Sequence, residues 1–70
     1  MTHTLQITLN GDRLELSGPM TVTQLLSWLD IDPRRVAIEH NLTVVKRSAY
    51  EDTLVREGDQ VEVVNFVGGG

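Results

Sequence analysis

Seventy residues, 40% apolar and 23% charged, suffice for one small globular domain, and the absence of cysteine excludes disulfides, thiolate metal sites and a cysteine nucleophile. The formal net charge of −4, with no basic run longer than two residues, argues against a nucleic acid or an anionic membrane as the main partner. We therefore expect a protein partner with a basic docking face, and, because no signal peptide or bilayer-spanning apolar run is found, a cytoplasmic location.

Residues 4–17 predict a β-hairpin. Apolar and polar residues alternate from Thr4 to Leu9 and again from Arg13 to Ser17, as in strands with one buried face. Between them lies Asn10-Gly11, a pair favoured in two-residue turns because both positions need positive φ.

A helix is predicted from about residue 22 to residue 30. Thr21 is a candidate N-cap, and Gln24 three residues later completes a capping box. Apolar residues then recur at the spacing of one helix face: Val22, Leu25, Leu26 and Leu29. We expect Asp32-Pro33 to end the helix, because a residue before proline is disfavoured in the helical region.

The second half of the chain predicts strands at residues 36–40, 43–45 and 60–66, with turns at Asn41 and at residues 57–59. The polar stretch 46–53 is expected to connect them with one helical turn. A helix this short must bury its leucines against a sheet. The order of elements therefore predicts an α+β fold of the β-grasp type, with residues 1–67 as the domain and residues 68–70 as a flexible glycine tail.

Few residues suggest catalytic chemistry. His3 and His40 lie far apart without metal-ligand spacing, so we expect no metal site. Ser48 has no paired base nearby in the sequence, and the carboxylates are scattered. We therefore do not expect an enzyme that acts on its own.

The final residues, in contrast, suggest a chemical role for the end of the chain. Gly68, Gly69 and Gly70 follow a strong strand, with only Val67 between Phe66 and the first glycine. At ~3.3 Å per residue they can carry a carboxylate roughly 10 Å beyond the folded body. Without side chains they can enter a narrow channel, and a terminal glycine leaves the carbonyl of an activated acid open to a nucleophile. The alternative is a frayed end or a cloning remnant.

At this point the chain resembles a known family, the sulfur carriers of thiamine biosynthesis, which are small ubiquitin-like β-grasp proteins. The resemblance runs from Leu5 onward and is carried by the order of weak motifs rather than by any single one. These motifs are Thr21-Val22 with Leu25-Leu26, Asn41 through Val44-Val45 to Lys46-Arg47 and Tyr50, Gly58-Asp59-x-Val61-Glu62-x-Val64, and Phe66-Val67-Gly68-Gly69-Gly70.

The resemblance implies a function for the C-terminus. Gly70 is expected to be adenylated by an E1-like adenylyltransferase with ATP and then converted to a thiocarboxylate with sulfur from a sulfur-donating enzyme. Thiazole synthase would consume that sulfur. The carrier would be a co-substrate that binds no cofactor itself, and we expect it to be a monomer alone.

Other functions remain open. The molybdopterin-synthase small subunit shares the fold and a Gly-Gly end but typically has a proline pair where this chain has Asn65-Phe66. Chain-building ubiquitin-like modifiers use several lysines, and this chain has only Lys46. Sulfur carriers of other pathways, or a β-grasp interaction module without tail chemistry, could share the quoted motifs.

The last strand also predicts a docking surface. If Val61 and Val63 face the helix, Val64 and Phe66 face away from it. We therefore expect Val64, Phe66 and Val67 to dock on a partner while Gly68 and Gly69 lie in its channel.

Three further groups of side chains have candidate roles. Trp28 lies off the apolar stripe of the helix and is expected to cap the edge of the core, the alternative being that it extends a surface patch. Arg34 and Arg35 could face an acidic partner, although a solvated pair is the more common case for exposed charges, and Glu62 could meet a basic one.

Overall fold

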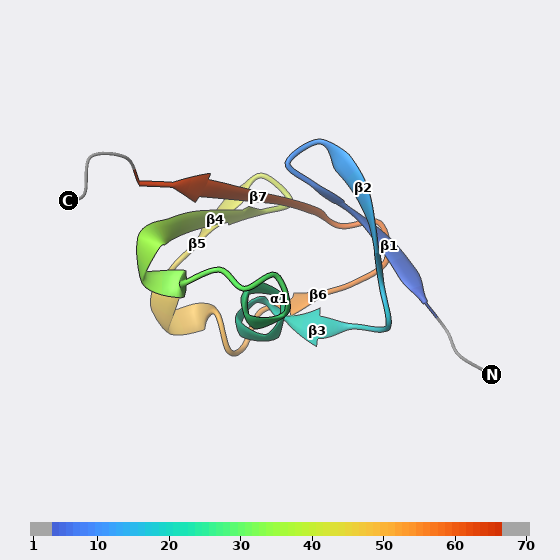
Figure 1. The fold of residues 1–70 in the computed structure, drawn as a ribbon, viewed down its shortest axis with the longest axis horizontal. Coiled ribbons are helices and arrows are strands. Elements are labelled where there is room, and N and C mark those ends of the chain that lie inside the picture. Colours follow the sequence, from blue (N-terminus) through green and yellow to red (C-terminus); the bar gives the residue numbers. More distant parts are fainter. Residues whose placement is uncertain (1–3, 67–70) are drawn as a thin grey trace.

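The computed structural model describes residues 4–66 as a five-stranded mixed sheet with one α-helix beneath it (Figure 1). The strand order is β2-β1-β7-β4-β5, and a separate two-stranded ribbon pairs β3 with β6. The elements are β1 (Leu5–Leu9), β2 (Asp12–Leu16), β3 (Met20–Thr21), α1 (Val22–Trp28), η1 (Pro33–Arg35), β4 (Val36–His40), β5 (Thr43–Val45), η2 (Arg47–Ala49), β6 (Leu54–Val55) and β7 (Gln60–Asn65), where η marks a single 3₁₀ turn.

The predicted hairpin is confirmed. β1 and β2 pair in antiparallel register from Leu5 opposite Leu16 to Leu9 opposite Asp12. Asn10 has φ of 50° and Gly11 has φ of 85°, the positive values that a tight two-residue turn requires. A side chain at Gly11 would meet no atom, so its backbone conformation, rather than space, favours glycine there.

The start of the helix is also confirmed. The Thr21 hydroxyl accepts the backbone N–H of Gln24 at 3.1 Å, and the Gln24 side chain accepts the Thr21 N–H at 2.9 Å. This capping box satisfies two backbone donors that would otherwise lack partners at the first turn.

The end of the helix differs from the prediction. α1 stops at Trp28 with Leu29 as its C-cap, because Asp30 adopts a left-handed conformation with φ of 60°. The Ile31 N–H then bonds to the Leu26 carbonyl at 2.9 Å and the Asp30 N–H to the Ser27 carbonyl at 3.1 Å, which is a Schellman motif. Asp32-Pro33 begins η1 instead of ending α1.

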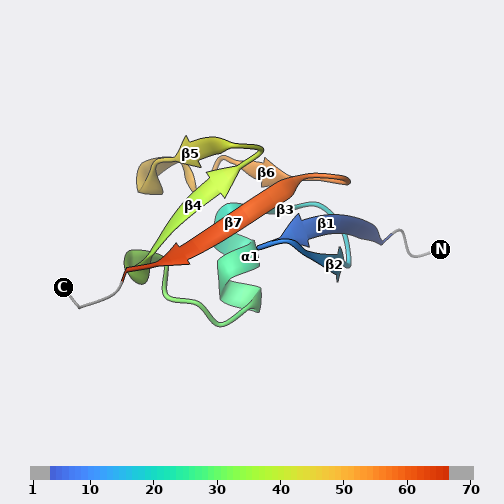
Figure 2. The same cartoon turned by 90° about the horizontal axis from the view of Figure 1, so that it is seen from above.

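α1 crosses one face of the sheet, and the core lies between them (Figures 1 and 2). Every buried residue among those described is apolar or tyrosine. They are Leu5, Ile7, Leu16, Val22, Leu25, Leu26, Val36, Ile38, Tyr50, Val55 and Val61. The connecting stretch 46–53 therefore contributes Tyr50 to the core, which its polar composition does not predict.

The sequence gives no signal for the β3–β6 ribbon. Each strand has two residues, too few for a period-two pattern, and they pair as Met20 with Val55 and Thr21 with Leu54. The ribbon buries Val55 and holds the start of α1, because the Val22 N–H donates to the Thr53 carbonyl at 2.9 Å.

β7 lies at the centre of the sheet although it is the last strand of the described residues. It runs parallel to β1 and antiparallel to β4 (Figure 2). Beyond the last β1 partner pair, Leu9 with Val61, the Asn10 side chain continues the ladder. Its amide accepts the Val63 N–H at 2.7 Å and donates to the Val63 carbonyl at 3.2 Å, as a backbone peptide would.

Asp59 anchors the start of β7. Its carboxylate accepts hydrogen bonds from His40 Nε2 at 2.6 Å, the Arg56 N–H at 2.9 Å and Asn41 Nδ2 at 3.2 Å. Partial burial acts to raise the pKa of this carboxyl, but the bonds from His40, Arg56 and Asn41 together outweigh burial and lower the pKa. The network therefore favours the ionised carboxylate.

Truncation of the core should destabilise the domain strongly. Leu26 is 0% exposed, so Leu26→Ala should lower the free energy of unfolding by about 2–5 kcal/mol, through lost apolar burial and the cavity left behind. Urea denaturation followed by circular dichroism measures this. A loss below about 0.5 kcal/mol would contradict the placement of Leu26 in the core.

The Asp59 network should stabilise the fold in a pH-dependent way. Because the pKa of Asp59 is lowered on folding, its contribution is present above about pH 4 and is lost as pH falls through the folded pKa. Asp59→Asn should therefore cost about 1–3 kcal/mol near pH 7 and less near pH 3, as measured by urea denaturation at both values. The exposed Asp12→Asn is the control, and an Asp59→Asn loss that is equal at both pH values would show that ionisation of Asp59 plays no part.

Candidate functional site

The outer face of β7 carries the predicted docking residues. Val61 is 1% exposed and Val63 packs against the core, whereas Val64 is 52% exposed and Phe66 is 58% exposed. The alternation predicted for this strand is confirmed. Docking of Val64 and Phe66 on a partner stays a prediction.

Neighbouring strands add to this surface. Ala37 on β4 lies opposite Val64, and Glu39 lies opposite Glu62, so two carboxylates sit side by side next to the apolar residues. Like charges directly across a strand pair are unfavourable. The surface is therefore apolar toward the end of β7 and acidic toward its middle.

The sheet holds the chain as far as Phe66. The ladder between β4 and β7 ends at the pair Val36 with Asn65, and the Phe66 N–H then donates to the Arg35 carbonyl at 3.0 Å. The remaining residues assigned to the site from the sequence, Val67, Gly68, Gly69 and Gly70, lie outside the described residues. Their roles stay predictions.

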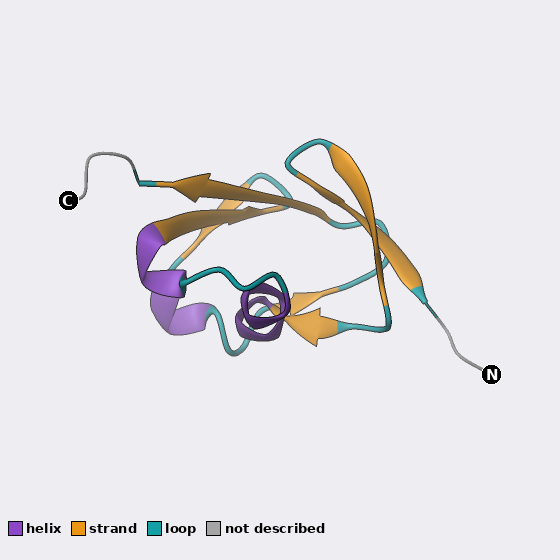
Figure 3. Cartoon of the chain, in the orientation of Figure 1, coloured by secondary structure: helices purple, strands orange, loops and turns teal. Residues whose placement is uncertain are grey.

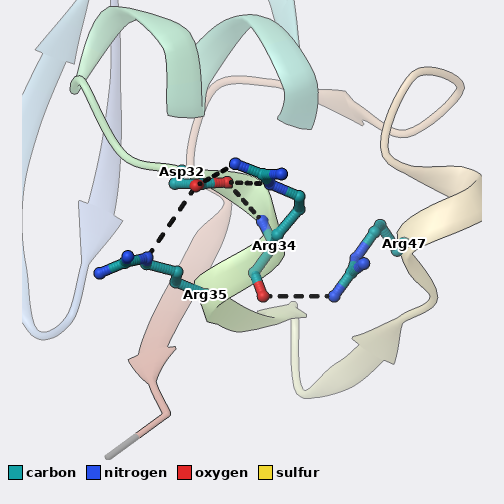
Figure 4. Close-up of polar contacts among 4 residues, drawn as sticks. All are labelled: Asp32, Arg34, Arg35 and Arg47. Carbon is teal, nitrogen blue, oxygen red and sulfur yellow. Dashed lines mark hydrogen bonds and ion pairs between the residues drawn. The ribbon is translucent and has the colours of Figure 1, made fainter. Parts of the chain in front are cut away.

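The 3₁₀ turn η1, which supplies the Arg35 carbonyl, is itself fixed by Asp32. The Asp32 carboxylate accepts the backbone N–H of Arg34 at 2.9 Å and two bonds from the Arg34 guanidinium at 3.1 and 3.0 Å (Figure 4). These hydrogen bonds from Arg34, first from its side chain and then from its backbone, lower the pKa of Asp32 to about 2. Arg35 Nε lies 4.0 Å from the same carboxylate.

The expectation that Trp28 caps the edge of the core is wrong, because Trp28 is 56% exposed and does not belong to the apolar cluster. It lies on the surface instead. The Arg34 side chain is 78% exposed, as expected for a solvated cation, and Asp32 also holds its guanidinium. The sequence signal for this contact is Asp-Pro-Arg, because an N-capping aspartate accepts a hydrogen bond from the residue two positions later.

The surface elsewhere offers little for small-molecule chemistry. An open hollow of about 400 Å³ lies between α1 and η1, and it is lined by Thr23, Ser27, Asp30, Ile31, Asp32 and Pro33. Within residues 4–66, no three His, Asp or Glu side chains come together in a way that suits a metal ion. No helix in this part of the chain is long and apolar enough to span a membrane.

Comparison with known proteins identifies relatives along almost the whole chain. The sequence model of the ThiS family matches residues 7–70. A thiamine biosynthesis protein (ThiS) from Geobacter metallireducens superimposes with a TM-score of 0.84 at 38% identity, over 94% of this chain and 100% of that one. The sulfur carrier protein ThiS of Escherichia coli is 29% identical, over 94% of this chain and all of its own length.

A second kind of relative is much longer. A protein named thiazole synthase from Paramagnetospirillum magneticum is 42% identical over 66 residues, which are 94% of this chain and 20% of the relative. One from Magnetococcus marinus is 41% identical with the same coverage. This chain thus spans about one fifth of the length of these two proteins.

Sequence and fold agree on the assignment. The family match includes the glycines at the end, and the β-grasp fold, with a mixed sheet on one helix, matches the solved ThiS structure. The chain belongs to the ThiS family, the sulfur carriers of thiamine biosynthesis.

Proposed function

We propose that this protein carries sulfur as a thiocarboxylate on Gly70 and donates it for formation of the thiazole ring. The observation that carries the proposal is the ThiS family match over residues 7–70, which includes the three glycines. The strand before them supports it, because β4 pairs with β7 as far as Asn65 and the Arg35 carbonyl accepts the Phe66 N–H, so the chain is held up to residue 66.

The chemistry needs two steps at the Gly70 carboxylate. A carboxylate oxygen attacks the α-phosphorus of ATP, a mixed anhydride with AMP forms, and pyrophosphate leaves. A sulfur nucleophile at the oxidation level of hydrosulfide then attacks the carbonyl carbon. A C–S bond forms, the C–O bond to AMP breaks, and a thiocarboxylate results without net oxidation or reduction.

The partner enzymes supply everything except this carboxyl group. An E1-like adenylyltransferase binds ATP and activates Gly70, and a sulfur-donating enzyme provides the nucleophile. The carrier holds no cofactor of its own, and the reaction takes place in the cytoplasm, where ATP is available. Val64, Phe66 and Val67 dock on the activating enzyme while Gly68 and Gly69 lie in its channel.

Thiazole synthase is the proposed acceptor of the sulfur. Two proteins with that name contain a stretch more than 40% identical to this chain. A carrier and an enzyme joined in one polypeptide meet at a high effective concentration, which is useful for partners that act together. We propose that this carrier and thiazole synthase act together in the same way.

Intact-mass spectrometry tests the proposal. After incubation with the E1-like enzyme, ATP and the sulfur donor, the wild-type protein should exchange one oxygen for sulfur. Deletion of Gly70 moves the carboxylate back by ~3.3 Å and should reduce this exchange at least ~100-fold, because a reacting group tolerates far smaller displacements. A chain extended beyond Gly70 should not be loaded either. Sulfur loading of such an extended chain would overturn the proposal.

The need for glycine, without a side chain, at residue 69 can be tested separately. Gly69→Val adds a branched side chain within the proposed channel and should block loading without changing the melting temperature. Gly18→Val is the matched control, because a side chain at Gly18 would meet no atom within 4 Å. Normal loading of Gly69→Val would show that no narrow channel encloses this residue.

The docking role of Phe66 has its own test. Phe66→Ala should weaken binding to the adenylyltransferase roughly tenfold or more, as removal of an aromatic anchor does. Its melting temperature should be nearly unchanged, because Phe66 is 58% exposed. Trp28→Ala removes a comparably exposed aromatic residue from the helix and should leave binding unchanged. A large drop in melting temperature with normal binding would instead make Phe66 a structural residue.

A further inference from the structure

Positive charge gathers at one end of this acidic protein. Four of the six basic residues in the chain belong to η1 or the start of η2, and we call them the basic cluster. They are Arg34, Arg35, Lys46 and Arg47. Figure 3 shows both 3₁₀ turns at the end of the sheet where β7 finishes. The net charge of −4 therefore conceals a local excess of positive charge.

The cluster adjoins the last residue of the described chain. The Arg35 carbonyl accepts the Phe66 N–H at 3.0 Å, so η1 lies directly beside the end of β7. Arg47 joins η2 to η1, because its Nη2 donates to the Arg34 carbonyl at 3.4 Å (Figure 4). Both basic turns thus lie at the end of the sheet where β7 finishes (Figure 3).

Most of this charge is not neutralised within the described residues. Asp32 is the one carboxylate within 4.0 Å of the cluster in residues 4–66, and Arg34 occupies it with two hydrogen bonds. Arg35 reaches it only at 4.0 Å and has a side chain that is 84% exposed. The exposed Lys46 and Arg47 form no ion pair there, although Asp30, Glu51 and Asp52 lie on flanking segments.

We infer that Arg35, Lys46 and Arg47 dock on an acidic protein surface around the channel that receives residues 67–70. The inference rests on the proposed function, since that function makes the chain end enter a partner. A protein surface fits better than a nucleic acid, because the remaining charge of the chain repels a long polyanion while the cluster attracts a local acidic patch within about 8 Å. Arg34 serves the fold through Asp32 and is not part of the docking set.

Charges at the rim of an interface act mainly on the association rate and on its salt dependence. The apolar residues Val64 and Phe66 would hold the complex, while the cluster would orient the approaching carrier so that its C-terminus faces the channel. Charge reversal in the cluster should therefore slow association strongly at low salt. Its effect should fade as salt screens the interaction.

The test measures binding kinetics of the carrier to the E1-like adenylyltransferase at about 50 mM and 500 mM salt. Arg35→Glu/Arg47→Glu should slow association at least ~10-fold at low salt and less than ~3-fold at high salt. The neutral Arg35→Gln/Arg47→Gln should lie between this variant and wild type. Arg13→Glu/Arg56→Glu is the matched control, because it makes the same change in net charge at exposed residues on β2 and before β7. It should change association less than ~3-fold.

Parallel intact-mass loading separates this inference from the proposed function. If wild type is loaded with sulfur but reversal of the cluster slows association no more than the control does, the docking inference is wrong. If wild type binds with the expected charge dependence but is never loaded, the docking surface is supported and the thiocarboxylate function is wrong. Tight, cluster-dependent binding of a labelled RNA oligonucleotide would overturn the assignment to a protein surface.

The variants should remain folded, which circular dichroism melting confirms or denies. Replacing Arg47 removes its long hydrogen bond of 3.4 Å to the Arg34 carbonyl, but both arginines are exposed, and the capping of η1 depends on Asp32 and Arg34, which are left intact. If the Glu variant has a much lower melting temperature than wild type, the docking inference is tested with the Gln variant alone. Unchanged association of a folded Gln variant at low salt would contradict the inference.

Discussion

The central position of β7 in the sheet is the constraint on which the rest of this structure depends. The strand pairs with β1 on one side and β4 on the other, so within residues 4–66 it is the strand that joins the two halves of the sheet. Alternation along β7 then separates two roles, because Val61 and Val63 pack against the core and Val64 and Phe66 face outward. One strand thus closes the fold and presents the apolar part of the candidate site.

Polar side chains extend the sheet where the backbone ladder ends. Asn10 pairs with both backbone groups of Val63, and Asp59 collects His40, Asn41 and the Arg56 N–H at the start of β7. A domain of this size buries a smaller fraction of its surface than a larger protein does, so such hydrogen bonds contribute a larger share of its stability. They also fix the register of the strand, and a slip by one residue would turn Phe66 inward.

The C-terminal end of β7 is held by the 3₁₀ turn η1. Asp32 caps η1 and holds the Arg34 guanidinium, and the carbonyl of Arg35 then accepts the N–H of Phe66. The same turn exposes the Arg35 side chain at the surface. Fold and proposed docking are therefore linked, because the turn that holds the end of β7 also carries two residues of the basic cluster.

Sequence alone determined the local elements, the β-grasp arrangement and the ThiS resemblance. Asn10-Gly11, the capping box at Thr21 and the leucine stripe act within a few residues of each other, so their structural result can be inferred without knowing the rest of the chain. Contacts between distant segments could not be inferred in this way. The short β3–β6 ribbon, the burial of Tyr50 and the approach of η2 to η1 arise only when segments far apart in sequence pack together. The helix end at Asp30 was likewise decided by a backbone conformation that aspartate adopts less readily than glycine, and the basic cluster exists only because the fold brings two short basic pairs to the same end of the sheet.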